Sequence, residues 1–338
     1  MIDGLSVLRI TSGVVKLDAV AQTGEKQPIG ILASLSTGFD SVTRQLWLLL
    51  LPAALDAFLW LGPRLKAARL WPVFAFEIPV GLDAQTRLFA QNLQETIRRA
   101  IESFNWLSFL RPTLLGVPGL MDGTAALTPA GVAPPEVQVD SPGSLAVIVL
   151  LLAVVGIGLG GLQWSLIARQ VRDGRIDWGA ALGRMSVIWP RLIGLGLLVI
   201  GSMLAVWLGA VLITLLLGAA SGVLSTLAVM LALSLMIWLL FYFTFGLHGI
   251  VLYNQRVLDA VRTSFRLGRT QFWSVFGMIL ALIAVEWGLG LIWRLAPLDS
   301  WLWAVAILGD AFVVAGVSMA TMLFYMDRVP IPSSALAP

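Results

Sequence analysis

Long apolar runs, separated by polar stretches, dominate the pattern of the sequence. A run of about 20 apolar residues can cross a bilayer as a helix, and the bilayer core offers no water to satisfy an irregular backbone. Six runs meet this condition: residues 44–61, 144–168, 190–217, 223–252, 272–295 and 301–326. The first run is the shortest and contains Pro52. The pattern therefore predicts an all-α, polytopic membrane protein with six transmembrane helices.

The segment between the first two runs, residues 62–143, has a different pattern. From residue 82 to residue 110, apolar residues recur every three or four positions, which predicts an amphipathic helix. Its apolar stripe includes Phe89 and Leu93, and we expect lipid or the helix bundle to cover it. Residues 111–143 are rich in Pro and Gly and are typical of an irregular loop.

The arginine residues predict the orientation of the chain. The stretches 169–189 and 253–271 each contain four Arg, and the positive-inside rule places short Arg-rich loops in the cytoplasm. Both termini then lie in the cytoplasm, residues 62–143 lie outside, and we expect the protein in a bacterial inner membrane. The predicted parts are a cytoplasmic leader, a transmembrane domain and a cytoplasmic tail, at residues 1–40, 41–326 and 327–338.

Similar stretches precede three of the runs. They are GFDSVTRQLW, WGAALGRMSVIWP and VLDAVRTSFRLGRTQFW, at residues 38–47, 178–190 and 257–273. Each combines apolar residues at helical spacing with Arg and a Trp suited to the water boundary. The pattern predicts three hairpins of two spans, each preceded by an amphipathic elbow helix on the cytoplasmic face. The alternative is that inner-membrane proteins in general begin their spans with Arg and Trp.

The last of these stretches contains an Arg stripe and a resemblance. Arg262, Arg266 and Arg269 recur at helical spacing and are predicted to contact lipid headgroups. Residues 254–280 resemble the elbow-and-span signature of six-span bacterial membrane proteins, which include the membrane domain fused to some glycerophosphodiester phosphodiesterases. The features that match are Ala260, Ser264, Phe265, Leu267 and the pair Phe272–Trp273. The resemblance does not extend to the phosphodiesterase domain, so it implies no enzymatic activity.

Composition narrows the chemistry. Only 12% of the residues are charged and 58% are hydrophobic, whereas soluble domains carry about 25% charged residues. The chain has no Cys, which excludes a thiolate nucleophile and a Cys-ligated metal site. Its single histidine, His248, has no companion ligands for a metal and no nucleophile motif nearby. We therefore expect an interfacial, hydrogen-bonded histidine, no cofactor and no nucleic-acid partner.

The glycine-rich stretch GIGLGG, residues 156–161, fits the pattern of a dinucleotide-binding turn. That function needs a strand followed by a helix that opens into water. Here the stretch lies inside an apolar run. Gly156 and Gly160 instead predict close helix packing through small residues.

Three carboxylates lie within the apolar runs, and they are the strongest indication of function. They are Asp56, Glu286 and Asp310, and at about 1.5 Å per residue all three fall between the midplane and the outer third of the membrane. An acid in lipid costs about 2.5–3.5 kcal/mol, so each should face the protein, hold a proton or meet a cation. We expect Asp310 beside Glu286, and Arg294, about two turns beyond Glu286, as a partner.

Two functions remain open, and the first of them is the one we expect. One is an accessory or scaffold protein that binds membrane lipids or other membrane proteins, in which the acids form a closed polar network. The other is a small proton- or cation-coupled transporter, in which the acids line a wet cavity and helices are broken at mid-depth. An intramembrane aspartic protease is the enzymatic alternative. The contexts AALDAF and AILGDAF match only half of one protease motif, and we expect no enzyme.

Overall fold

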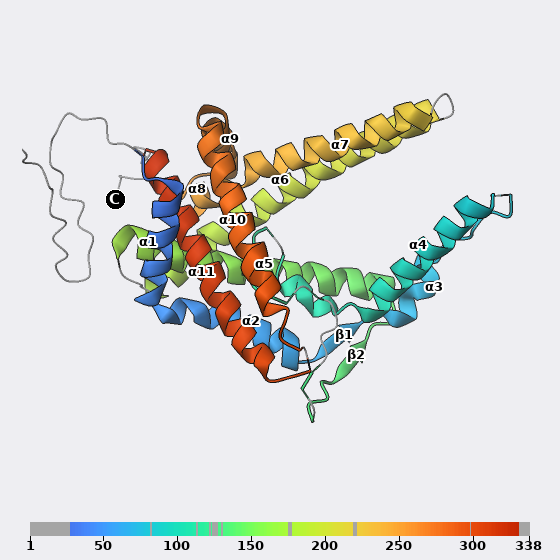
Figure 1. The fold of residues 1–338 in the computed structure, drawn as a ribbon, viewed down its shortest axis with the longest axis horizontal. Helices are drawn as coiled ribbons and strands as arrows, with labels where there is room; N and C mark the ends of the chain where they lie inside the picture. Colours follow the sequence, from blue (N-terminus) through green and yellow to red (C-terminus); the bar gives the residue numbers. More distant parts are fainter. Residues whose placement is uncertain are drawn as a thin grey trace, which may run out of the picture.

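The computed structural model describes residues 28–330, except residues 82, 113, 122, 124–127, 130, 175–177, 219–221 and 298. Most of the predicted leader and tail, residues 1–27 and 331–338, lies outside the described residues. The described part is almost entirely helical (Figure 1), and its sheet consists of two short strands. The elements in chain order are α1 (Ile31–Thr43), η1 (Leu46–Leu49), α2 (Leu50–Leu61), β1 (Arg64–Lys66), η2 (Ala68–Leu70), α3 (Trp71–Phe74), α4 (Ala84–Ser103), η3 (Trp106–Leu110), β2 (Glu136–Gln138), α5 (Pro142–Asp173), α6 (Trp178–Gly218), α7 (Gly222–Phe243), α8 (Gly246–Tyr253), α9 (Val257–Thr270), α10 (Phe272–Trp293) and α11 (Leu302–Arg328).

Five stretches of the described chain are long and apolar enough to cross a membrane. They are α5, α6, α7 continued by α8, α10 and α11. The first predicted span forms η1 and α2 instead, a helical stretch of only 16 residues, about 24 Å long. This stretch meets α1 at an angle of 96°. If α1 and this stretch are counted together as one bent span, the number of candidate spans is six. The protein is therefore an all-α, polytopic membrane protein.

The predicted elbow helices take two forms. The helices α1 and α9 are separate from the spans that follow them, and a single residue, Gln271, lies between α9 and α10. The predicted elbow 178–190 is not a separate helix, because α6 runs without a break through Pro190. A proline inside a helix removes one backbone hydrogen bond, yet α6 continues through Pro190. The preceding residue, Trp189, links α6 to α5, because its Nε1 atom donates a hydrogen bond to the carbonyl of Val154 at 2.9 Å.

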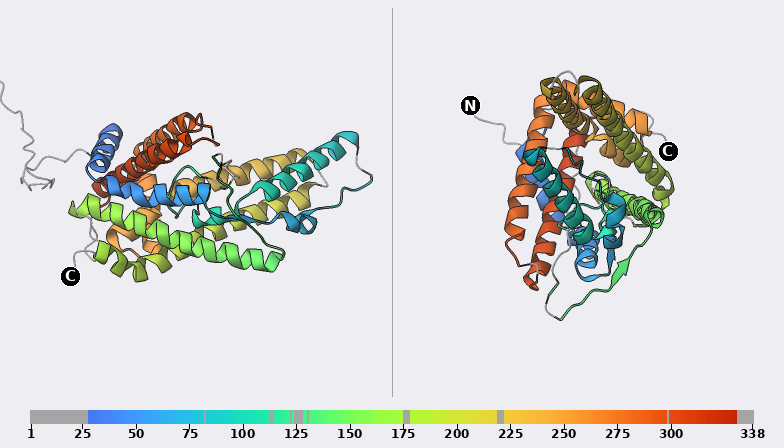
Figure 2. Two further views of the ribbon diagram at one scale, coloured as in Figure 1. Left: turned by 90° about the horizontal axis from the view of Figure 1, so that it is seen from below. Right: turned by 90° about the vertical axis from the view of Figure 1, so that its right-hand side faces the viewer.

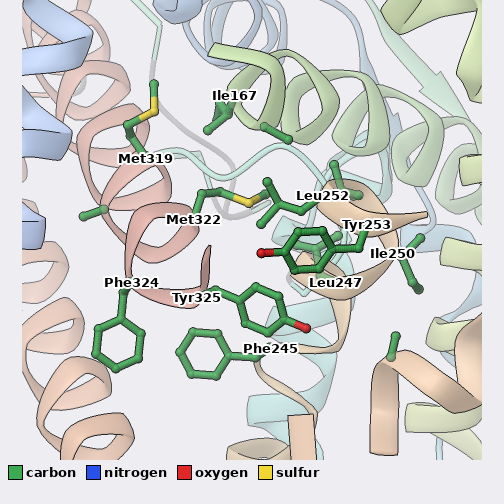
Figure 3. Packing of buried hydrophobic residues seen from close by; sticks show 14 of the residues in the cluster. Ile167, Phe245, Leu247, Ile250, Leu252, Tyr253, Met319, Met322, Phe324 and Tyr325 are labelled. Carbon is green, nitrogen blue, oxygen red and sulfur yellow. The ribbon is translucent and has the colours of Figure 1, made fainter. Parts of the chain in front are cut away.

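The helix α11 forms the centre of the bundle, since its residues from Val313 to Tyr325 are all buried except Leu323. The rings of Phe245, Phe324 and Tyr325 pack together beside it (Figure 3), with centroids 5.7 and 5.9 Å from that of Phe245. The ring of His248 is buried between those of Trp164, Phe245 and Tyr325, and its expected position at the membrane interface stays a prediction. Aromatic packing of α5, α8 and α11 therefore encloses the histidine.

The helix α1 lies along α11 rather than apart from the bundle. At Gly38 of α1, an added Cβ would lie 2.7 Å from the carbonyl oxygen of Gly316 and 2.9 Å from the Cβ of Ala320. The two backbones can approach this closely because all three residues are small. Arg328 at the end of α11 also donates a hydrogen bond to the carbonyl of Ile29, at 2.9 Å.

The segment between α2 and α5, residues 62–143, forms an arm and a wedge, and the wedge consists of η3 and the described residues from Arg111 to Met121. The strands β1 and β2 pair in parallel, and α3 and α4 extend away from the bundle as the arm (Figures 1 and 2). Phe89 and Leu93 on α4 are 68% and 43% exposed. The bundle therefore does not cover this part of the predicted stripe, because α4 stands away from it; coverage by lipid stays a prediction.

Candidate functional site

The wedge begins at η3, shortly after α4 ends. A buried ion pair is the first contact that holds it against the bundle. Asp56 of α2 is fully buried, and Arg111 Nη1 donates to its Oδ1 atom. The backbone amides of Leu120 and Met121 also donate to this carboxylate, at 2.8 and 3.1 Å. Arg111 in turn donates to the carbonyls of Val117 and Met121, at 3.0 and 2.7 Å. One charged pair thus holds residues 111–121 against α2.

The second anchor of the wedge is a glycine groove in α5. A Cβ added at Gly156 would collide with the carbonyl of Leu110, and one added at Gly160 would collide with the carbonyl of Leu115. Small residues at this spacing were expected to allow close packing, and they do. Their partners, however, are the last residue of η3 and the irregular backbone that follows it, rather than another long helix.

The position of the groove shows how deep the wedge reaches. Gly156 and Gly160 lie about 21 and 27 Å along α5 from its first residue, Pro142, and the whole helix, at 32 residues, is about 48 Å long. The wedge therefore meets the middle of α5. Irregular backbone at membrane depth is tolerated only where protein buries it or where it lines a water-filled cavity.

A cavity of about 460 Å³ lies between the wedge and the helices α10 and α11. Glu286, Gly290 and Arg294 line it from one face of α10, at four-residue intervals. Asp310 lines it from α11. The wedge and the residues before it contribute Phe104, Ser108, Phe109, Arg111, Pro112 and Val117 to Met121. The cavity therefore combines aromatic walls with charged groups.

The structure brings together most of the predicted polar cluster. Glu286, Asp310 and Arg294 line the same cavity, and Asp56 lies behind its wall, joined to it through Arg111. The charges of Asp56, Arg111, Glu286 and Arg294 all act on Asp310. Arg111 is not among the predicted site residues, because its Pro- and Gly-rich segment is typical of an irregular loop.

The three carboxylates differ in their partners. Asp56 accepts hydrogen bonds from a guanidinium and two amides, as described above. Asp310 is buried, and its Oδ2 atom has no hydrogen-bond partner among the described residues. Glu286 is exposed along the cavity, and no hydrogen bond or ion pair links it to a residue in the described part of the chain. Glu286 and the Oδ2 atom of Asp310 therefore differ from Asp56 in having no partner among the described residues.

The predicted headgroup residues lie elsewhere. Arg262, Arg266 and Arg269 are exposed along α9. Arg262 Nη1 lies 3.4 Å from Asp259 Oδ1 on the same helix. The buried face of α9 carries Ser264, whose hydroxyl donates to the carbonyl of Tyr242. This stripe is thus separate from the cavity, and its contact with lipid headgroups stays a prediction.

Comparisons with known proteins returned no relative. The chain matches no protein-family model, and no curated protein and no solved structure matches it. The resemblance of residues 254–280 to the six-span membrane proteins therefore stays a prediction. The functional argument rests on the geometry of the cavity.

Proposed function

We propose that this protein is a small transporter of the bacterial inner membrane that binds a cationic solute in the cavity between the wedge and the helices α10 and α11. The observation that carries the proposal is the difference in partners among the three acids. Asp56 is neutralised by Arg111, whereas Glu286 and the Oδ2 atom of Asp310 have no hydrogen-bond partner among the described residues. A closed scaffold would be expected to pair all three.

The size and charge of the cavity suit a small cation. Pockets for small molecules usually measure about 300–1,000 Å³, and this one measures about 460 Å³. Three carboxylates and two guanidiniums lie in it or directly behind its wall. If all five are ionised, one negative charge remains, and a cation or a proton compensates it. The aromatic rings of Phe104 and Phe109 line the cavity as well and favour a cation with an apolar part.

The architecture around the cavity also supports transport. Transporters commonly place their binding sites near mid-depth, where the backbone departs from regular helices. The wedge supplies such backbone beside α5. In Figure 1, the α6–α7 pair and the α10–α11 pair diverge from the end of the molecule where α8 and α9 lie. A change in the angle between the two pairs would alter access to the cavity.

In the proposed cycle, Glu286 and Asp310 exchange a proton for the cation. Two ionised carboxylates in one cavity of low dielectric constant repel each other, and a bound cation or proton removes that repulsion. The cycle is thus expected to couple cation movement to a proton gradient. We infer from the Arg-rich stretches that both termini lie in the cytoplasm, so that the wedge enters from the outside.

The test is the flux of small organic cations, such as tetraethylammonium, into vesicles that contain the purified protein under an imposed proton gradient. Glu286→Gln keeps the shape of the side chain and removes its charge, and we expect coupled flux to fall at least about tenfold, the effect of losing about 1.4 kcal/mol of binding. Glu102→Gln, on the exposed part of α4, is the matched control and should leave flux unchanged. Equal flux in the two variants would contradict the proposal.

An accessory role is the second candidate, because α7 offers an extensive apolar surface. Only 6% of its membrane-spanning window is buried within the protein. Lipid or a partner helix from another membrane protein could cover the remainder. A partner that co-purifies with the wild type, and is lost when Leu231 and Ile237 on this surface are changed to Ser, would favour this role. Unchanged co-purification in that variant would argue against it.

A further inference from the structure

Three arginines surround a small crevice between the end of α5 and the start of α6. Arg169 and Arg172 come from the last turns of α5, and Arg184 comes from the second turn of α6. Ile188 and two residues of α8, Val251 and Leu252, form its apolar floor. None of these residues lines the cavity described above, so this is a separate feature.

Among the residues that the structure describes, the three arginines carry more positive charge than the acids around them compensate. Arg172 pairs with Asp173, at 2.8 Å, and Arg169 donates to the carbonyl of Ala180, at 2.9 Å. No hydrogen bond or ion pair links the half-buried Arg184 to a residue that the structure describes. Asp173 attracts it from a longer distance, while Arg169, Arg172 and Arg191 repel it. The apolar residues beside the arginines weaken the screening by water, so the positive charges repel one another more strongly. A bound anion would remove this repulsion.

The crevice lies at a level where lipid headgroups are expected. Trp178, the first residue of α6, packs its ring against that of Trp47, with centroids 5.0 Å apart. Tryptophan rings of membrane proteins gather at the boundary between the headgroups and the acyl chains. Arg184 follows Trp178 by less than two helical turns. The arginines are therefore close to the layer that contains phosphate groups.

We infer that this crevice is a phosphate-binding site, occupied by the headgroup of an anionic phospholipid or by free phosphate. Its volume of about 10 Å³ admits one oxygen-sized group rather than a whole phosphate. One phosphate oxygen would enter above Ile188, and the others would stay at the mouth, within reach of the three guanidiniums. Guanidinium is suited to this role because its planar fork binds two phosphate oxygens at once.

The experiment measures the thermal unfolding of the full chain in three media. They are phosphatidylcholine vesicles, phosphatidylcholine vesicles that contain phosphatidylglycerol, and phosphatidylcholine vesicles in millimolar inorganic phosphate. The wild type should unfold at a higher temperature in the second medium if the source is lipid, and in the third if it is free phosphate. Arg184→Gln should lose most of whichever gain occurs, with binding about tenfold weaker.

Arg69→Gln is the matched control, because Arg69 is equally basic but exposed and paired with Asp140; it should keep the gain. Arg184→Lys keeps the charge without the planar fork and should keep part of it. If Arg184→Gln does not fold, mass spectrometry of the wild type decides, since it should retain phosphatidylglycerol or phosphate in preference to phosphatidylcholine. An equal gain in Arg184→Gln and Arg69→Gln, or no preferential retention, would overturn the inference.

Discussion

Asp56 is stabilised in the bundle by a partner 55 residues away along the chain, Arg111. A buried ion pair contributes little net stability, because the cost of desolvation offsets the attraction between the charges. Removal of one partner is different, since it leaves an uncompensated charge in a medium of low dielectric constant. Because this pair also holds the backbone of Leu120 and Met121, its loss should release the wedge.

Asp56→Leu should therefore lower the free energy of unfolding by about 3–5 kcal/mol. The double variant Asp56→Leu with Arg111→Met should recover a large part of this loss, because no charge is left without a partner. Thermal or denaturant unfolding of the purified protein measures both effects. The exposed pair Arg69–Asp140 is the control, with side chains 67% and 62% exposed, and Asp140→Ala should cost no more than about 1 kcal/mol. Similar losses at Asp56 and Asp140 would refute the structural role of the buried pair.

Glu95 on α4 shows the effect of arginine on an exposed acid. Arg98 and Arg99 donate hydrogen bonds to its carboxylate and lower its pKa from 4.5 to about 2. Because the folded pKa is the lower one, the contribution of Glu95 to the stability of α4 is complete above the unfolded pKa, near 4.5, and is lost as pH falls towards 2. Magnetic resonance titration of labelled Glu should show this shift. Changing Arg98 and Arg99 to Gln should return the pKa towards 4.5, and an unchanged titration would exclude these hydrogen bonds as its cause.

At the scale of elements, the hydrophobic pattern predicts the long helices well and their partners poorly. The helices α5, α6, α10 and α11 fall on predicted apolar runs, because the length of an apolar run reports directly on the lipid around it. The pattern does not distinguish residues that face lipid from residues that face the protein, since both are apolar. It therefore gave no sign that the wedge, and not another helix, occupies the groove at Gly156 and Gly160.

The groove gives a second prediction about stability. Gly156→Ala places a methyl group against the carbonyl of Leu110 and should destabilise the protein by about 1–3 kcal/mol, as overpacking does. Gly201→Ala on α6 is the matched control, because a Cβ at that position meets nothing within 4 Å. It should be neutral or stabilising by up to about 1 kcal/mol, from helix propensity alone. Unfolding measurements that rank the two variants in the opposite order would contradict a tightly seated wedge.

At the scale of the whole molecule, the sequence predicts the class of protein and identifies the unusual acids, but it does not predict the cavity. Glu286 and Asp310 stand out because carboxylates are costly in lipid. Their partner on the wedge, Arg111, could not be found in this way, since an arginine in a Pro- and Gly-rich segment is ordinary outside a membrane. The cavity depends on that segment folding back between helices, which no local pattern encodes.

The orientation of the chain is a prediction at the same scale. Since the chain has no Cys, single cysteines report cleanly on their side of the membrane. Ser141→Cys, before α5, should react with a membrane-impermeant reagent added outside, and Thr270→Cys, at the end of α9, should be protected; both positions are exposed. Ser264 is unsuitable because its side chain is buried. The opposite labelling pattern would invert the proposed topology.

The central claim is that water and cations reach Glu286 through the cavity, and the accessibility of Gly290 tests it most directly. Gly290 lines the cavity one turn from Glu286, and a Cβ added there meets nothing within 4 Å. In Gly290→Cys, a cationic methanethiosulfonate should react about tenfold faster than an anionic one, because the acids attract it, and Glu286→Gln should reduce this preference. Leu291→Cys, on the neighbouring exposed apolar face, should react slowly with both reagents. If Gly290→Cys were as unreactive as Leu291→Cys, or preferred the anionic reagent, the account of a cation-binding cavity would be wrong.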